Sequence, residues 1–387
     1  MSAILDAVQE IAGDVRAWRR HLHSHPELSY QEHETTAFVE ARLREFGIET
    51  QRPTPTGVVG IIDGAGPGRT VALRADIDAL PIQEENDVPY RSTRDGVMHA
   101  CGHDAHTAML LGAARVLAQH RSRWRGRIKL LFQPAEELPP GGAVQFIEAG
   151  VLDGVDAIAG LHVMSNVPVG KAAIRPGTVM AHADKFTIEI EGKGGHGAAP
   201  HQACDPVVVA SQLVLNLQTI VSRRVNPVQP AVVTVGAIES GTTFNVIPGW
   251  ARLLGTTRCF DDQVRELLRR ELERIAQHTC AMAGATCRVE YEYGYPALVN
   301  DPGVAQVLRD AAAAVLGPEN VLDQEPILGG EDFAHYTRRV PGAFLFLGVG
   351  NEEIGAAYPH HHPRFNLDES ALASGVKILV KTALDLL

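Results

Sequence analysis

The chain has 387 residues, of which 45% are hydrophobic and 21% charged, a composition typical of globular proteins that excludes an intrinsically disordered chain. This length exceeds what one hydrophobic core normally supports, so we expect two domains or one domain with an insertion. The formal net charge of -11 argues against nucleic-acid binding, and no stretch approaches eighteen apolar residues, which argues against a membrane span.

Two amphipathic helices are predicted at the start of the chain. Apolar residues recur at helical spacing up to His25, where Pro26 restricts the backbone before it and ends the first helix. Residues 34–46 form the second helix, and Gly47 suits its C-terminal cap.

Four later segments are short, rich in Val, Ile, Leu and Phe, and bounded by turn or polar residues. They are residues 70–81, 127–137, 157–163 and 343–350. Nearly continuous apolar runs are typical of strands buried on both faces, so we predict an α/β fold with a mixed, largely parallel sheet covered by helices. Such sheets bind ligands at the carboxyl ends of their strands. The polar residues at these ends are Asp76, Asp78, Glu136, Glu137 and His162.

Between residues 183 and 293 the pattern changes to that of a separate α+β unit. A half-exposed strand is followed by a helix that Asp205 caps and Pro206 opens, then by two strands, a helix and a last strand. This order predicts a ferredoxin-like domain inserted into the α/β domain. The main domain would then comprise residues 1–182 and 294–387, and the insert residues 183–293.

The first candidate metal ligands are Cys101 and His103, two residues apart in the segment "VMHACGHDAHT". We expect this segment to be a glycine-containing loop. The pair alone is a weak signal, and a redox role would also fit the thiol. Its interpretation therefore depends on whether distant segments supply ligands of the same kind.

Candidate partners do occur at other predicted strand ends. Glu136 and Glu137 follow an apolar run, which argues against an exposed acidic turn. Where one of two adjacent carboxylates binds a metal, the other is free to act as a general base on water. His162 and a run of three histidines near the C-terminus add imidazoles, and this mixture of donors suits two divalent ions.

Several motifs in a fixed order resemble a known family. They are "RRHLHSHPELSYQE", "LRADIDALP", "HACGHDAHT", "FQPAEE", "GLHV", "GKGGHGAAPH", "FNVIP", "GGEDFA" and "HHPRFN". Together they resemble the metal-dependent aminoacylase/carboxypeptidase superfamily, in the subfamily of hippurate hydrolase, N-acyl-amino-acid amidohydrolases and auxin-conjugate hydrolases. The resemblance implies a catalytic domain with a two-metal site, an inserted lid domain, and hydrolysis of the amide between an acyl group and an amino acid.

The resemblance also implies roles for individual residues. The implied metal ligands are Cys101, His103, Glu137, His162 and His361. Glu136 would be the catalytic acid and base. His361 precedes a proline by two positions, as the last ligand does in this subfamily, but His360 and His362 flank it and either could replace it.

Further roles are implied around the metal ligands. Asp78 would orient a ligand without binding metal. In the lid domain, His196 resembles the residue that polarises the scissile carbonyl, while Asn245 and Arg258 resemble groups that contact the substrate. Gly330 of "GGEDFA" would be another substrate contact. These lid residues would reach the metals through closure of the lid.

The implied cofactor is a pair of divalent ions per subunit, zinc or manganese first, with cobalt or nickel as alternatives. The implied partner is a small-molecule N-acyl-amino acid, and a homodimer through the lid domain is also expected. The alternatives are a dipeptidase or carboxypeptidase of the same superfamily and, less favoured, a non-catalytic metal-binding protein.

The cysteines favour a reducing compartment. The chain has five, widely spaced, and its first residues show no apolar segment that would direct secretion. We therefore expect a cytoplasmic protein.

Overall fold

The computed structural model describes residues 2–387, with side-chain environments from residue 4 onward. The chain divides into two compact units. The larger comprises residues 2–179, 299–325 and 332–387, and the smaller residues 180–298 and 326–331.

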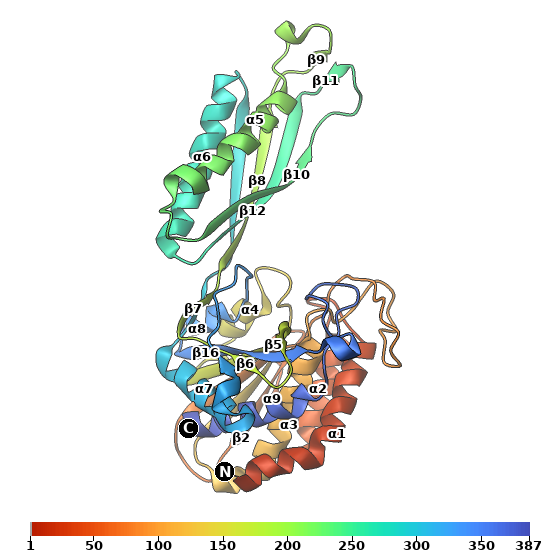
Figure 1. Ribbon diagram of the computed structural model, residues 1–387, viewed down its shortest axis with the longest axis vertical. Helices are drawn as coiled ribbons and strands as arrows, with labels where there is room; N and C mark the ends of the chain where they lie inside the picture. The colour runs from red at the N-terminus through yellow and green to blue at the C-terminus, as the bar shows by residue number, and fades with distance from the viewer. Residues whose placement is uncertain (1) are drawn as a thin grey trace. The chain divides into compact units, whose positions relative to one another are not determined.

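The larger unit is built on one mixed sheet with the strand order β1-β2-β4-β3-β5-β16-β6-β15 (Figure 1). Its strands are β1 (Glu49–Gln51), β2 (Val58–Asp63), β3 (Thr70–Asp76), β4 (Arg127–Gln133), β5 (Ala157–Pro168), β6 (Ala172–Ala173), β15 (Val321–Leu322) and β16 (Gly342–Gly350). The adjacent strands β4, β3, β5 and β16 run parallel to one another. These four strands are the four that the apolar runs predicted, and the predicted α/β class is confirmed.

Helices cover both faces of this sheet (Figure 1). They are α1 (Ser2–Ser24), α2 (His33–Glu45), α3 (His103–Gln119), α4 (Gly142–Glu148), α7 (Pro302–Leu316), α8 (Ala334–Thr337) and α9 (Ala371–Leu386). Leu345 of β16 belongs to the core that the sheet shares with α1, α3, α7 and α9. Its neighbour Phe344 points to the opposite face, because side chains alternate along a strand, and there it packs on Phe333 next to α8.

The smaller unit contains a four-stranded antiparallel sheet of order β10-β12-β8-β13. Its elements are β8 (His182–Glu191), β9 (Gly195–His196), α5 (Pro206–Thr219), β10 (Ala231–Glu239), β11 (Val246–Ile247), β12 (Trp250–Cys259), α6 (Asp262–Met282) and β13 (Thr286–Tyr295). The order β8-α5-β10-β12-α6-β13 is that of a ferredoxin-like unit. Asp205 caps α5 by accepting the N–H of Val207, and Pro206 occupies the first turn, as the sequence predicts.

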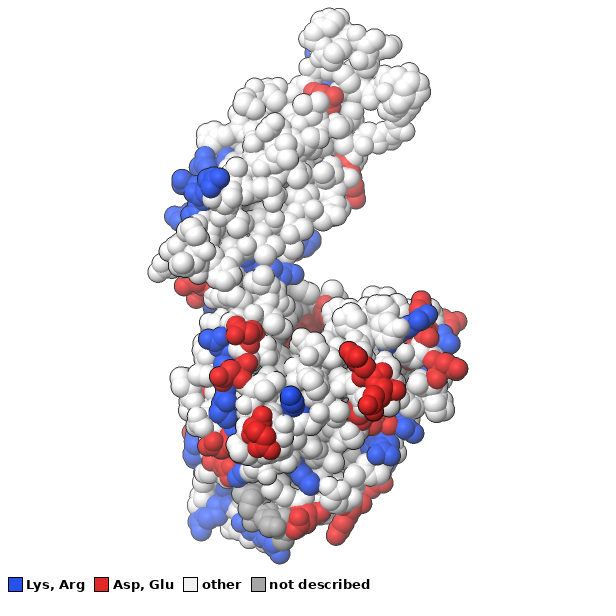
Figure 2. Space-filling view, viewed as in Figure 1, with Lys and Arg blue, Asp and Glu red and all other residues white. Residues whose placement is uncertain are grey.

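Two further short strands, β7 (Gly177–Met180) and β14 (Leu298–Asn300), pair with each other. On the face of the larger unit seen in Figure 2, acidic and basic side chains are interspersed. Within residues 2–387, no helix combines the length and the apolar character needed to cross a bilayer.

Two local expectations near the candidate site are wrong. His103 does not lie in a loop, because it is the first residue of α3, which follows Gly102 in a left-handed conformation with φ of 88°. His162 does not end its strand, because β5 continues to Pro168. Pairing of β5 with β3 stops at Gly160, however, so His162 lies just past the point where β5 and β3 separate.

Candidate active site

Side chains from four segments of the larger unit converge near the carboxyl ends of β3 and β4, where β5 separates from β3. Their potential ligand atoms form three overlapping groups, each with all its atoms within 4.8 Å of one another. The groups are Cys101 with His103 and His162, Cys101 with Glu137 and His361, and His103 with Glu136 and Glu137. The structure therefore brings together the five residues predicted as metal ligands, and it places Glu136 beside them.

Cys101 and His162 form one side of this cluster. The Sγ atom of Cys101 lies 3.5 Å from Nε2 of His162. Nδ1 of His162 lies 2.7 Å from the carbonyl oxygen of Val163, which can only accept, so Nδ1 carries the proton and Nε2 has a free electron pair. Burial, followed by the charges of His106 and His360, holds the pKa of His162 well below its usual value, so the ring is neutral. A neutral imidazole with this tautomer is the form that binds a metal.

Asp78 fixes the opposite side of the cluster. Nδ1 of His103 lies 3.0 Å from the carbonyl oxygen of Asp78 and 3.2 Å from its Oδ1. The other carboxylate oxygen, Oδ2, accepts hydrogen bonds from the backbone N–H of Glu137 (3.0 Å) and from Ser29 Oγ (2.7 Å). One buried carboxylate thus contacts two of the candidate ligand residues, and the orienting role of Asp78 stays a prediction.

His361 reaches the cluster from the loop after β16. Its backbone has φ of 64°, an uncommon conformation for a residue other than glycine, and its N–H donates to the carbonyl of Ala100 at 2.9 Å. This conformation directs Nε2 to 3.2 Å from Oε1 of Glu137. The carboxylate of Glu137 raises the pKa of His361 more than burial lowers it.

The two neighbouring histidines have other contacts. His362 accepts the N–H of Arg364 on Nδ1 at 3.0 Å, and its ring stacks on Tyr358 with centroids 4.7 Å apart. His360 packs edge-on against His162, with ring centroids 5.2 Å apart. Neither residue belongs to a metal-ligand group of the described chain, whereas His361 does.

The charges of the cluster fit a bound cation. Nε2 of His103 and Oε1 of Glu137 are buried and make no hydrogen bond within the described residues. Burial and then the acids Glu137 and Glu136 hold the pKa of the Cys101 thiol well above its usual value. Burial lowers the pKa of His103, but Asp76, Asp78 and Glu137 together raise it to about 10. Without a cation, the Cys101 thiol and the His103 ring keep their protons beside the buried acids. A divalent ion would take the place of these protons and bind the same sulfur, nitrogen and oxygen atoms.

A second buried network supports the first turn of α3. Nε of Arg19 lies 2.9 Å from Oδ2 of Asp104, and Nδ1 of His23 lies 2.7 Å from the same oxygen. The other ring nitrogen of His23 lies 3.1 Å from Glu84. Asp104 directly follows His103, so this network anchors a candidate ligand through the backbone.

These buried partners were not predicted from the sequence, and neither was the role of His106. His106 lies 2.6 Å from Asp76 through Nδ1 and accepts the N–H of Val163 on Nε2. A helix predicted at residue 103 would have revealed it, because residues three apart lie on the same helix face. Both nitrogens of His106 are occupied, so its proximity to Asp76 and His103 does not make a further metal site.

The predicted substrate residues lie in the smaller unit. His196 is paired with Val246 in the short β9–β11 ribbon, and Asn245 accepts the N–H of Gly197 at its carbonyl (2.9 Å). This ribbon brings His196 and Asn245 together. His196 is exposed, and its Nδ1 accepts the N–H of Ala198 at 3.0 Å.

Arg258 and Gly330 do not join that ribbon. β11 ends just before Trp250 begins β12, whereas Arg258 lies near the other end of β12, about 26 Å along the strand at 3.3 Å per residue. Arg258 is half-buried and donates to Thr256 Oγ1 at 2.6 Å. Gly330 packs closely on Ala183, since a Cβ at position 330 would lie 2.8 Å from the Cβ of Ala183.

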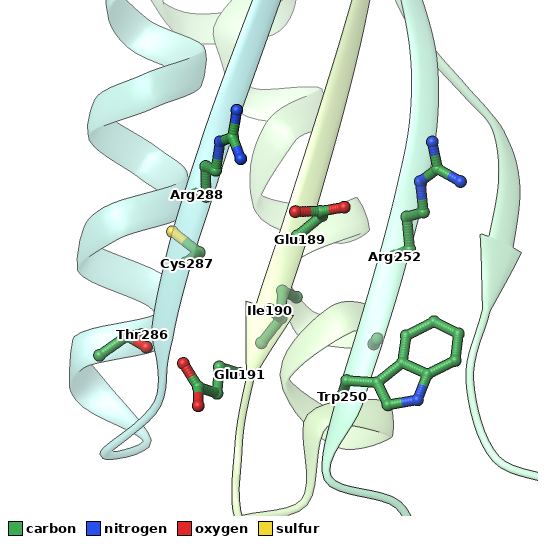
Figure 3. Close-up of a pocket in the computed structure, with 9 residues that line it drawn as sticks. Glu189, Ile190, Glu191, Trp250, Arg252, Thr286, Cys287 and Arg288 are labelled. Carbon is green, nitrogen blue, oxygen red and sulfur yellow. The ribbon is translucent and has the colours of Figure 1, made fainter.

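A hollow of about 500 Å³ also lies on the sheet of the smaller unit (Figure 3). Glu189 of β8 stands in register with Arg252 of β12 on one side and Arg288 of β13 on the other. Trp250 borders the hollow, and its indole is half exposed. None of the lining residues is a histidine, and none belongs to a metal-ligand group of the described residues.

This chain is similar to a family of known proteins over most of its length. The model of peptidase family M20/M25/M40 matches residues 72–385. An N-acyl-L-amino acid amidohydrolase of Geobacillus stearothermophilus is 50% identical over 294 residues, covering 76% of this chain and 80% of the relative. Thermostable carboxypeptidase 1 of Saccharolobus solfataricus is 43% identical over 382 residues, covering 96% of each chain.

A solved structure agrees with these matches. The crystal structure of a dinuclear metal-binding peptidase of the M20 family from Bacillus subtilis superposes with a TM-score of 0.85 at 38% sequence identity. The match covers 98% of this chain and 99% of that chain.

Proposed function

Because the chain belongs to peptidase family M20/M25/M40, we propose that it is a metal-dependent amidohydrolase that cleaves N-acyl-amino acids into a carboxylic acid and a free amino acid. The observation that carries this proposal is the convergence of a thiol, three imidazoles and a carboxylate around Glu136. The N-acyl-L-amino acid amidohydrolase that is 50% identical to this chain supports the substrate class.

The metal centre would hold two divalent cations. The residues that would bind them are Cys101, His103, Glu137, His162 and His361. A thiolate with imidazoles favours zinc, while manganese, cobalt and nickel accept the same donors. When bound, such cations lower the pKa of water toward neutrality and stabilise negative charge on a carbonyl oxygen.

Glu136 is proposed as the acid and base of the reaction. Its carboxylate is buried and lies in the same group as His103 and Glu137, so it is placed beside the metal ligands without being needed as one. It would take the proton of the attacking water and return it to the departing amine. The amide is thereby exchanged for a carboxylic acid and a free amino group, and Glu136 ends in its starting state.

Residues of the smaller unit are proposed to bind the substrate. His196 would donate a hydrogen bond to the scissile carbonyl oxygen as negative charge develops on it. Arg258 would pair with the carboxylate of the amino acid, since it is half-buried and its hydrogen bonds go to neutral groups. Asn245 and Gly330 are proposed as further contacts.

A carboxypeptidase or dipeptidase activity is the second candidate, favoured by the thermostable carboxypeptidase that matches 96% of the chain. A panel of N-acetyl and N-benzoyl amino acids, dipeptides and longer peptides separates the two activities when product amines are quantified. We expect turnover of the N-acyl amino acids and little release from peptides. Release from peptides alone would overturn the proposed substrate class.

We further propose a cytoplasmic homodimer. The five cysteines are free thiols, which suits a reducing compartment. β10 and β13 are the edge strands of the smaller unit's sheet, and an edge strand offers backbone groups to a second copy. Light scattering in solution should therefore give twice the mass of one chain.

A further inference from the structure

The backbone N–H of Val163 lies past the point where β3 pairs with β5. The pairing of β3 with β5 ends at Arg74 and Gly160, whereas β5 continues through Val163. Val163 is fully buried, and a buried N–H needs an acceptor. Nε2 of His106 accepts this N–H at 2.9 Å.

The hydrogen bonds of His106 define its tautomer. Since Nε2 accepts from Val163, the proton lies on Nδ1, which donates to Oδ1 of Asp76 at 2.6 Å. The other oxygen of Asp76 accepts from Nη1 of Arg74 at 2.7 Å. Arg74, Asp76 and His106 are each at most 2% exposed, so these contacts are shielded from bulk water.

The backbone carbonyl of Val163 contacts the candidate metal ligand His162. Its carbonyl oxygen accepts the Nδ1 proton of His162 at 2.7 Å, and the freed Nε2 lies 3.5 Å from the Sγ atom of Cys101. Val163 also packs on the other ligand segment, because a Cβ at Gly102 would lie 2.3 Å from its side chain. One residue is therefore held by His106 at its N–H and holds His162 at its carbonyl.

We infer that His106 is a positioning residue: together with Asp76 it fixes the Val163 backbone, and through that backbone the tautomer and direction of the metal ligand His162. The inference rests on the proposed metal centre. It assigns to His106 a function other than ligation, since neither of its nitrogens is free to bind a metal.

The inference predicts weaker metal binding when the relay from Asp76 through His106 to Val163 is broken. In His106→Leu, the Val163 N–H loses its acceptor, so the carbonyl that holds His162 is no longer fixed. Loss of an outer partner of a metal ligand typically lowers metal affinity about 10 to 100-fold. His106→Gln keeps an acceptor and a donor on one side chain, and it should retain most of the wild-type affinity.

The experiment titrates metal-free protein with Co²⁺ and records visible absorption, which reports both the geometry of the bound ion and the thiolate contact. Thr107→Val is the matched control. Thr107 is equally buried in the same helix turn, and its hydroxyl donates to the carbonyl of Asp76 at 2.9 Å, whereas the acceptor of the Val163 N–H is His106. We expect a 10 to 100-fold weaker Co²⁺ affinity and an altered spectrum in His106→Leu only.

If His106→Leu has the Co²⁺ affinity and spectrum of wild type, the inference is wrong while the proposed function stands. If Thr107→Val loses as much Co²⁺ affinity as His106→Leu, the effect is one of general packing and the inference is also wrong. If wild-type protein binds no Co²⁺, the metal centre itself is wrong, and the inference falls with it. Should His106→Leu fail to fold, His106→Gln is compared with His106→Asn. The Asn amide is one methylene shorter and cannot span Asp76 and Val163, so equal affinities in these two variants would again contradict the relay.

Discussion

Nε2 of His361 lies 3.2 Å from Oε1 of Glu137, although 224 residues separate them in the chain. The contact joins the loop after β16 to the loop after β4, and His361 makes it from a left-handed backbone conformation. A residue held in such a sparsely populated conformation by its surroundings is typical of a functional site.

The three adjacent histidines should therefore differ in their effect on metal binding. His361→Ala removes a proposed ligand, and we expect it to weaken binding of one ion by more than the roughly 10 to 100-fold that loss of an outer partner costs. His362→Ala is the control, because His362 faces Tyr358 and Arg364. Metal content after dialysis, measured by elemental analysis, compares the two. If His362→Ala loses more metal than His361→Ala, then His362 and not His361 is the ligand.

Glu136→Ala tests the proposed acid and base. Glu136 is not needed as a ligand, so the variant should retain its metal while its kcat falls about 100 to 10,000-fold, the usual contribution of a positioned proton donor and acceptor. Metal content and steady-state kinetics are measured on the same sample. Near wild-type kcat in a metal-loaded variant would remove Glu136 from the reaction.

Arg258→Ala should raise KM for an N-acyl-amino acid. A hydrogen bond to a charged group contributes about 1.5 to 3 kcal/mol, which corresponds to roughly 10-fold or more in affinity. Arg252→Ala on the same strand is the control, because Arg252 lies 4.0 Å from Glu239 at the exposed surface. An unchanged KM in Arg258→Ala would exclude it from the substrate site.

Asp104 should make the stability of the larger unit depend on pH. Burial raises the pKa of its carboxyl, but Arg19 and His23 hold that pKa far below its usual value. The pKa of Asp104 is lower in the folded chain than its value of about 3.9 in the unfolded chain, so the charged carboxylate stabilises the fold above about pH 3.9. This stabilisation is lost progressively as the pH falls from about 3.9 toward the folded-state pKa. Asp104→Asn should cost about 3 to 5 kcal/mol at pH near 7, because it removes the carboxylate that faces buried Arg19 and His23 and leaves Arg19 with Glu369 alone.

Urea unfolding at neutral and acidic pH measures this effect. The difference in free energy of unfolding between wild type and Asp104→Asn should become smaller below a pH of about 4. Asp14→Asn is the control, since Asp14 and Arg115 form an exposed pair worth at most about 1 kcal/mol. A difference that stays constant across this range would show that Asp104 acts by packing and not by charge.

The parts of the fold that could be predicted from sequence are those with a clear pattern. The four buried parallel strands appear as apolar runs, and the cap at Asp205 marks the start of α5. α3 was not predicted because nearly every residue from His103 to Ala118 is buried, so the helix has no polar face and no helical period. α7 did carry a signal, since Asp301 caps it and Pro302 occupies its first turn.

The sequence identified the residues of the proposed ligand set, which the structure brings together, but it did not reveal the contacts that support them. Cys101, Glu137 and His361 belong to motifs that can be recognised in the sequence. The partnership of His106 with Asp76 and Val163 depends on where β5 separates from β3, and only the strand register reveals that position. Likewise, Arg19 meets Asp104 through the packing of two helices that are far apart in the chain.

Metal dependence is tested by removing and restoring the ions in one preparation. The protein is stripped with a chelator, its hydrolysis of an N-acyl-amino acid is assayed, and one divalent metal is then added back while bound metal is counted. We predict no hydrolysis in the stripped protein and recovery as the content approaches two ions per chain. Full hydrolysis in protein shown to contain no metal would contradict a metal-dependent site at Cys101, His103, Glu137, His162 and His361.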